Sequence, residues 1–274
     1  MTHLSVAHLT ALHLDPPALI TACAEAGFDA VGLRLIQVTP TTPGYDLMDD
    51  HALMRATKAA MRATGLAVSD IEFVKITPDI DLGALNRVLD AGAELGARHL
   101  ITAPYDEDHL RLADRLAAID AAARARGLSA VMEFFPWTSV PDLTTCHAVV
   151  EAAGAGPGLL VDSLHFDRSQ SSLAELATIP AQRLRFAHLC DARVAPPYTI
   201  EELLRTARED RLPPGEGEID LGAFVAALPA DLPLGLEVPM AGPEMRDHPI
   251  AALTRLRLAT EALIARITDT PPST

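Results

Sequence analysis

The sequence predicts a single-domain α/β protein whose eight parallel strands close into a (β/α)8 TIM barrel. Short apolar runs alternate with longer stretches of helical spacing, which is typical of βα units around a parallel sheet. The apolar runs begin roughly 30 residues apart, enough for one strand and one helix each, until a longer last gap. We expect the barrel to span residues 1–267, with a flexible, proline-rich tail over 268–274.

Eight runs are expected to form the strands. They are short, rich in branched apolar residues and bounded by turn-forming residues, as buried parallel strands are. In chain order they read HLSVAHL, AVGLRL, LAVSDIEFV, RHLITA, SAVMEFF, LLVDSLHF, RFAHLCD and LGLEVP.

The stretches between these runs predict helices. Five of them end in glycine, in EAG, ATG, ELG, ARG and AAG, and glycine readily adopts the left-handed conformation that closes a helix. The long gap before the last strand, residues 192–218, holds an additional helix-like segment between two PP pairs, which we interpret as an insertion near the catalytic face. The main helices are expected over residues 17–26, 50–64, 82–95, 110–126, 143–153, 172–178, 221–228 and 249–267.

Composition excludes several classes of protein. The net charge of −15 would repel a nucleic-acid backbone or an anionic membrane, so a small-molecule partner is expected. The sequence contains neither an export signal nor an apolar run long enough for a membrane span. Three widely spaced cysteines, without a CxxC motif, favour the reducing cytoplasm. A doubly wound nucleotide-binding fold is improbable, because no GxGxxG or GxxxxGK[ST] sequence follows the first strand.

Four polar residues lie in the second half of the last four strand runs: Glu133, Asp162, His188 and Glu237. In a barrel the carboxyl ends of the strands form the catalytic mouth, so these side chains should converge there. A buried carboxylate such as Asp162 needs a charged or hydrogen-bonding partner. Taken singly, each residue also fits a hydrogen-bonded structural role, but the set of carboxylates and imidazole suits one divalent metal ion, with Mn foremost and Mg, Co or Zn as alternatives.

These motifs resemble the xylose-isomerase-like barrel superfamily, in particular its sugar phosphate isomerase/epimerase family. DSLH is similar to the family's DxxH, PPGEGEIDLGAF to its PGxGxxD, and HLCDAR to its HxKDxR, with Cys190 in place of the usual lysine. The resemblance covers the whole chain. It implies that Glu133, Asp162, His188 and Glu237 hold a single divalent metal, and it allows a homodimer, because relatives often dimerise.

The resemblance also implies a reaction. Its epimerase members use the two metal-bound glutamates, here Glu133 and Glu237, to move a proton next to a carbonyl through a metal-stabilised enediolate. The leading hypothesis is therefore an isomerase or epimerase of a small sugar, keto-polyol or related hydroxy-ketone. The alternative is a lyase similar to 3-dehydroshikimate or inosose dehydratase, in which His165, the histidine of DxxH, would help as an acid or base.

Further residues are candidates for substrate binding. Arg34, Glu72 and Lys75 are expected at the catalytic ends of the second and third strands, although structural ion pairing explains them equally well. Arg193 would present a cationic fork to a substrate oxygen, or would pair with Asp191. Trp137 would form an apolar wall or pack on the barrel rim.

Two other functions compete with this interpretation. Endonuclease IV shares the fold, but it assembles three zinc ions and carries a positive DNA-facing surface, whereas this chain is strongly acidic. A barrel that binds its ligand without turnover would bind metal but show no proton exchange.

Overall fold

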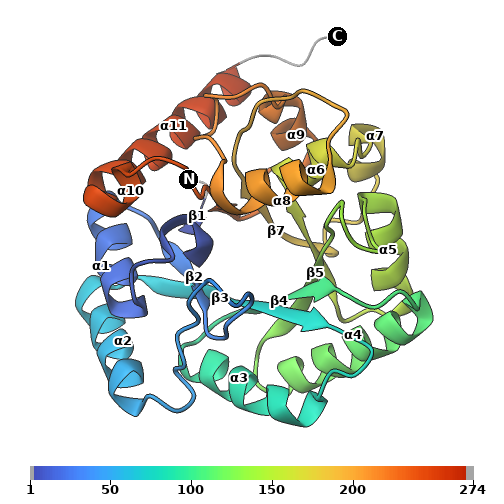
Figure 1. Ribbon diagram of the computed structural model, residues 1–274, viewed down its shortest axis with the longest axis horizontal. Coiled ribbons are helices and arrows are strands. Elements are labelled where there is room, and N and C mark those ends of the chain that lie inside the picture. The colour runs from blue at the N-terminus through green and yellow to red at the C-terminus, as the bar shows by residue number, and fades with distance from the viewer. Residues whose placement is uncertain (1–2, 270–274) are drawn as a thin grey trace.

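The computed structural model describes residues 3–269, and within them eight parallel strands form a closed barrel in chain order. β1 pairs with both β2 and β8, which closes the sheet. The strands lie at the centre of the molecule (Figure 1). The strands are β1 Leu4–Val6, β2 Ala30–Arg34, β3 Ala67–Ile76, β4 His99–Pro104, β5 Ser129–Glu133, β6 Gly158–Asp162, β7 Leu184–Leu189 and β8 Leu234–Leu236.

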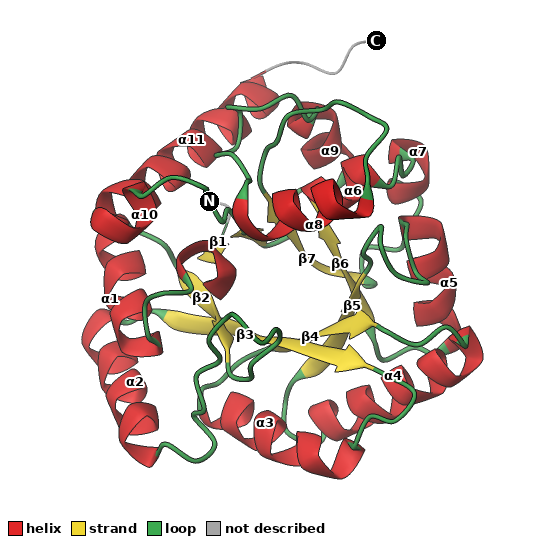
Figure 2. Ribbon diagram, in the orientation of Figure 1, coloured by secondary structure: helices red, strands yellow, loops and turns green. Residues whose placement is uncertain are grey.

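Helices surround the strands as an outer ring (Figure 2). An amphipathic helix, α8, stands apart from this ring: it lies on the inner side, across part of the barrel opening (Figure 1). The helical segments are η1 His8–Ala11, α1 Pro16–Ala26, α2 His51–Thr64, α3 Leu82–Glu94, α4 His109–Arg124, α5 Leu143–Ala152, α6 Ser163–Arg168, α7 Leu173–Leu176, α8 Ile200–Glu209, α9 Leu221–Ala227, α10 Glu244–Asp247 and α11 Pro249–Asp269.

Local capping explains why the main helices begin and end where they do. An aspartate accepts backbone N–H groups at the start of α1, α2, α3, α4 and α5, which satisfies donors that the first helical turn leaves free. All five glycines predicted to close a helix have positive φ, and Gly27 and Gly65 are themselves the left-handed caps of α1 and α2.

The predicted elements are confirmed, with shifts at some ends. The run LLVDSLHF is not all strand: β6 stops at Asp162, whose carboxylate caps α6, so His165 lies on that helix. α11 continues to Asp269, two residues into the expected tail. Residues 270–274 of the expected tail lie outside the described range. Among the described residues, no helix is both long and apolar enough to cross a membrane.

The core consists of two parts. The larger part packs between the strands and the outer helices, as expected for this architecture. The smaller part is a cluster of four buried side chains contributed by β4, β5, β6 and β7. Its members are Ile101, Val131, Leu160 and Phe186.

The first prediction concerns the acid stability of this fold. Burial lowers the pKa of His8 and of His99 from 6.5 to about 4. Between these two pH values both side chains stay neutral in the folded protein, whereas the same histidines take up protons in the unfolded chain. The contribution of these two histidines to the free energy of unfolding is therefore fully present above pH 6.5, and it is lost as the pH falls from 6.5 through 4. A shift of this size corresponds to about 3 kcal/mol per histidine.

Urea unfolding between pH 7.5 and 5 measures this effect. The His99→Asn variant, which keeps a polar group near Ser129 Oγ, should lose less stability over this range than the wild-type protein does. Equal pH dependence of the two proteins would contradict the assignment.

Candidate metal centre

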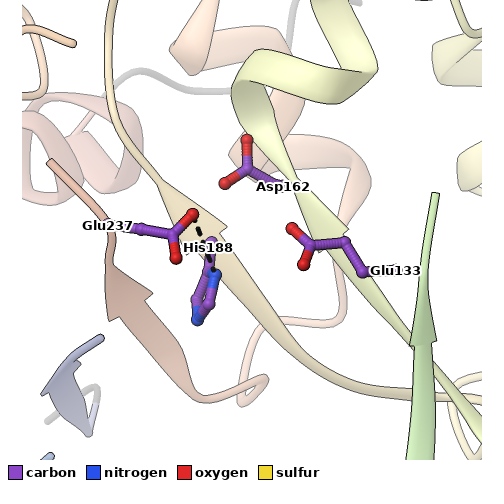
Figure 3. Close-up of side chains that lie close together, drawn as sticks. All are labelled: Glu133, Asp162, His188 and Glu237. Carbon is purple, nitrogen blue, oxygen red and sulfur yellow. Dashed lines mark ion pairs between the residues drawn. The ribbon is translucent and has the colours of Figure 1, made fainter. Parts of the chain in front are cut away.

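Four side chains meet at the carboxyl ends of the last four strands. Glu133, Asp162 and His188 are contributed by β5, β6 and β7, and Glu237 follows β8 directly. Each offers one ligand atom, and these atoms all lie within 4.8 Å of one another (Figure 3). Oxygen ligands bind divalent ions at about 2.0–2.6 Å, so atoms around one ion are separated by at most about 5 Å. The spacing therefore fits a single shared ion.

The strand period explains the convergence. Val131, Leu160 and Phe186 belong to the smaller apolar cluster, and the residue two positions after each of them points to the same side of its strand. Those residues are Glu133, Asp162 and His188. The polar cluster thus lies one layer above an apolar plug, toward the mouth of the barrel.

Two of the four side chains have a buried polar atom without the hydrogen bond that such atoms normally have. Glu133 Oε1 and His188 Nδ1 are buried without a partner, and His188 Nδ1 lies 3.9 Å from Glu237 Oε2. Burial, followed by the nearby carboxylates of Glu237 and Asp162, raises the pKa of Glu133 well above its usual range. Buried polar atoms without partners are rare. A cation among them would supply what they lack, so these residues fit a divalent metal.

Arg211 is the residue of this site that the sequence analysis did not identify. It is fully buried, and its guanidinium bridges two of the four side chains, with Nη1 2.6 Å from Asp162 Oδ2 and Nη2 2.8 Å from Glu237 Oε2. The partner that Asp162 requires is therefore, in part, a protein cation. Asp162 Oδ1 accepts the N–H groups of Leu164 and His165.

The charges around Asp162 keep it ionised. Burial by itself would raise the pKa of this carboxyl group, but the positive charge of the adjacent Arg211 is the largest opposing influence, and the pKa is lowered to about 2. A carboxylate oxygen has two lone pairs, so Asp162 Oδ2 can accept from Arg211 and still face a metal ion. The arginine and a metal are thus compatible partners.

His165 lies against the cluster as expected. Its Nε2 is 3.8 Å from Glu133 Oε1, its Nδ1 has no hydrogen-bond partner, and burial lowers its pKa to about 3. The imidazole is therefore neutral. Phe135 and Trp137 stack on each other and meet its edge, with ring centroids 4.9 and 5.3 Å from that of His165. Trp137 therefore lines the pocket next to His165.

Three further predicted residues line the same pocket. Arg34 Nη2 lies 3.1 Å from Glu72 Oε1, and both side chains are buried, so their structural pairing is real while they also face the pocket. Lys75 lies nearer the solvent, with its Nζ 2.9 Å from the carbonyl oxygen of Val38. The pocket encloses about 950 Å³ of space, part of it open to solvent, and contains Glu133, Glu237 and Arg211 in its lining.

Arg193 does not join the site. It is exposed and lines a different hollow, together with Arg168 and Tyr198. Asp191 explains the departure, because its carboxylate accepts backbone N–H groups from residues 192, 215 and 219 and thereby turns the chain away from the mouth. Among the described residues, Arg193 also forms no ion pair with Asp191, so neither expected arrangement of this arginine is present.

The insertion brings new residues to the pocket in its place. Ala207, Arg208 and Glu209 at the end of α8 line the pocket, and Arg211 follows them two residues later. One part of the segment 192–218, from Ala207 to Arg211, therefore lies at the pocket that contains Glu133 and Glu237. One signal for Arg211 is present in the sequence: a buried carboxylate such as Asp162 needs a positively charged partner. Nothing in the sequence distinguishes Arg211 from the other arginines of this segment, so the partner could not be identified.

Comparison with known proteins identifies the family. The family model described as xylose isomerase-like TIM barrel matches residues 20–258. The chain therefore belongs to the xylose isomerase-like TIM barrel family.

Individual relatives narrow the class further. An inosose isomerase of Bacillus velezensis is 22% identical over 223 residues, which cover 75% of this chain and 76% of that protein. A 3-dehydroshikimate dehydratase of Pseudomonas aeruginosa is 30% identical over 132 residues, which cover 46% of this chain and 20% of the dehydratase. The solved IolI protein with a zinc atom aligns at a TM-score of 0.77 and 19% identity, covering 98% of this chain and 100% of that one. These relatives are an isomerase and a dehydratase, which supports an enzyme of this superfamily, and the match to the zinc-containing structure shows that the two proteins share the fold.

The second prediction tests the buried arginine. Arg211→Met should lower the free energy of unfolding of metal-free protein by about 3–5 kcal/mol, because it leaves Asp162 ionised and unpaired in the interior. The matched control is Arg205→Met, which removes an exposed ion pair with Asp210 on the same segment and should cost less than about 1 kcal/mol. Urea unfolding of both variants provides the comparison, and equal losses would refute the role of Arg211.

Proposed function

We propose that this protein is a divalent-metal-dependent isomerase or epimerase that moves a proton next to the carbonyl of a small sugar, keto-polyol or related hydroxy-ketone. The observation that carries the proposal is the convergence of Glu133, Asp162, His188 and Glu237, whose ligand atoms lie within 4.8 Å of one another. Buried Oε1 of Glu133 and Nδ1 of His188 have no other partner, which favours a shared cation.

In this proposal the four residues hold the metal, with Mn the preferred ion and Mg, Co or Zn as alternatives. When bound, the ion supplies Lewis acidity to neighbouring oxygens of a hydroxy-ketone. Glu133 and Glu237 lie on different strands of the mouth and are the candidate proton carriers. His165, neutral and 3.8 Å from Glu133, can donate to or accept from a substrate hydroxyl.

The rest of the pocket positions the substrate and excludes water. Phe135 and Trp137 form an apolar wall beside His165, which lowers the local dielectric around the reacting groups. Arg34, held by Glu72, offers a fixed cationic fork to a substrate oxygen.

A dehydratase is the second candidate. It would use the same proton abstraction and then expel a β-hydroxyl, with His165 as the acid beside the leaving group. The sequence match to a 3-dehydroshikimate dehydratase favours this reaction, although it spans less than half of this chain.

The third prediction concerns metal content. Purified protein should contain about one divalent ion per chain by elemental analysis, and Asp162→Ala should lose it, because this carboxylate is one of the four ligands. Asp79→Ala, which removes an exposed carboxylate after β3, should retain it. Unchanged metal in Asp162→Ala would remove the basis of the proposed function.

The fourth prediction concerns the chemistry. Incubation with ketoses, inososes or 3-dehydroshikimate in deuterated water should place deuterium on the carbon next to the carbonyl, detected by NMR. His165→Gln should keep the metal and slow the reaction by about 10²–10⁴-fold. Label without loss of water supports the isomerase, and loss of water, with or without label, supports the dehydratase. Neither exchange nor loss of water across the panel contradicts both.

A further inference from the structure

Two cationic side chains lie at the mouth of the pocket without a carboxylate partner. Lys75, near the end of β3, and Arg208, on α8, both line it. Among the ion pairs of the described part of the chain, none within 4 Å includes either residue. Glu209 also lines the pocket, but it is exposed and is paired with neither of them. The two positive charges are therefore available to a ligand.

Lys75 is held in place by its neighbours. Its Nζ donates to the carbonyl oxygen of Val38, 2.9 Å away, and lies 5.0 Å from the ring centroid of Tyr105. The Tyr105 hydroxyl in turn accepts from Trp137 Nε1 at 3.5 Å, which connects this lysine to the aromatic wall beside His165. One hydrogen-bond acceptor leaves two of the three ammonium protons free to face the pocket.

Arg208 and Lys75 line the same pocket, so their positive charges face a common space. The pKa of Lys75 is lowered by burial and, next, by the positive charge of Arg208. Two like charges that face a common space repel each other, and a bound anion removes that repulsion. Thr39, Thr41 and Thr42 line the same pocket. The hydroxyls of Thr39 and Thr42 are hydrogen-bonded to each other at 2.7 Å, so one of these two hydroxyls, together with that of Thr41, can donate to such an anion.

The pocket is thus electrically divided. At its inner end lie the carboxylates of Glu133 and Glu237, with Arg211 and the Arg34–Glu72 ion pair beside them, and at its mouth lie Lys75 and Arg208. A divalent metal would neutralise the negative charge that Arg211 leaves at the inner end. A neutral sugar would leave the two mouth cations without a counter-charge. A ligand with hydroxyl and carbonyl oxygens at one end and an anionic group at the other would match both ends.

We propose that Lys75 and Arg208 form an anion subsite, so that the substrate is a hydroxy-ketone that carries a carboxylate or a phosphate at the end remote from the metal centre. This inference rests on the proposed function for the orientation of the substrate, but the anion preference is measurable in binding alone. Arg208 precedes Arg211 by three residues, so one short segment supplies a cation to each end of the pocket.

The experiment compares matched ligands by calorimetric titration of the metal-loaded, full-length protein. Shikimate and its methyl ester share one ring and differ in the carboxylate, while fructose 6-phosphate and fructose differ in the phosphate. At least one charged ligand should bind ten-fold or more tightly than its uncharged counterpart, and the favoured pair identifies the anion as carboxylate or phosphate. The preference should shrink as NaCl is raised, because the subsite is open to solvent.

Variants assign the preference to the two residues. Lys75→Met combined with Arg208→Gln should abolish it while metal content stays unchanged, and Lys75→Arg should retain it. Arg205→Gln is the control, because Arg205 lies on the same helix but lines the neighbouring hollow.

Equal binding within both ligand pairs, absence of measurable binding by either charged ligand, or a preference that survives the double variant would overturn the subsite. These outcomes differ from failure of the proposed function, which is loss of metal binding or of deuterium exchange. A protein that exchanges deuterium into neutral ketoses alone would keep its proposed function and lose the anion subsite.

Discussion

The ion pairs of Arg211 with Asp162 and Glu237 are the interaction on which the rest of the site depends. Three carboxylates converge at the mouth of the barrel, in a place from which water is largely excluded. Unpaired, they would destabilise the fold by several kcal/mol each. Arg211 supplies one positive charge, contacts two of the three, and is held by the carbonyl oxygens of Ala207 and Glu237. The barrel can therefore carry this cluster before a metal is bound.

The same charges argue for a divalent rather than a monovalent ion. With Glu133, Asp162 and Glu237 ionised, the cluster carries three negative charges, and Arg211 leaves two of them uncompensated. One divalent cation would neutralise this remainder, whereas a monovalent ion would leave a buried negative charge. The raised pKa of Glu133 has the same origin, since protonation relieves part of the excess when no ion is present. Metal binding should accordingly release a proton.

The sequence was sufficient to predict the fold and the residues that occupy equivalent positions on neighbouring strands. Strand and helix periods, together with glycines that close helices, located every strand because they are local signals of a repeated βα unit. The same regularity brought Glu133, Asp162 and His188 to one layer, since each stands at the same position near the end of its strand. Residues that act through such regular elements are predictable from their spacing alone.

The positions of residues in the insertion, 192–218, could not be predicted from strand spacing. Arg193 stands four residues after the end of β7 and appeared well placed, but the Asp191 carboxylate accepts three backbone N–H groups and turns the chain outward. The chain then returns through α8, and a bridge between Asp191 and Leu212 brings Arg211 back to the mouth. Which arginine arrives there depends on these tertiary contacts and not on local sequence. The helix that closes this detour also carries Arg208, so the segment least predictable from the sequence is the one that gives the pocket its cationic side.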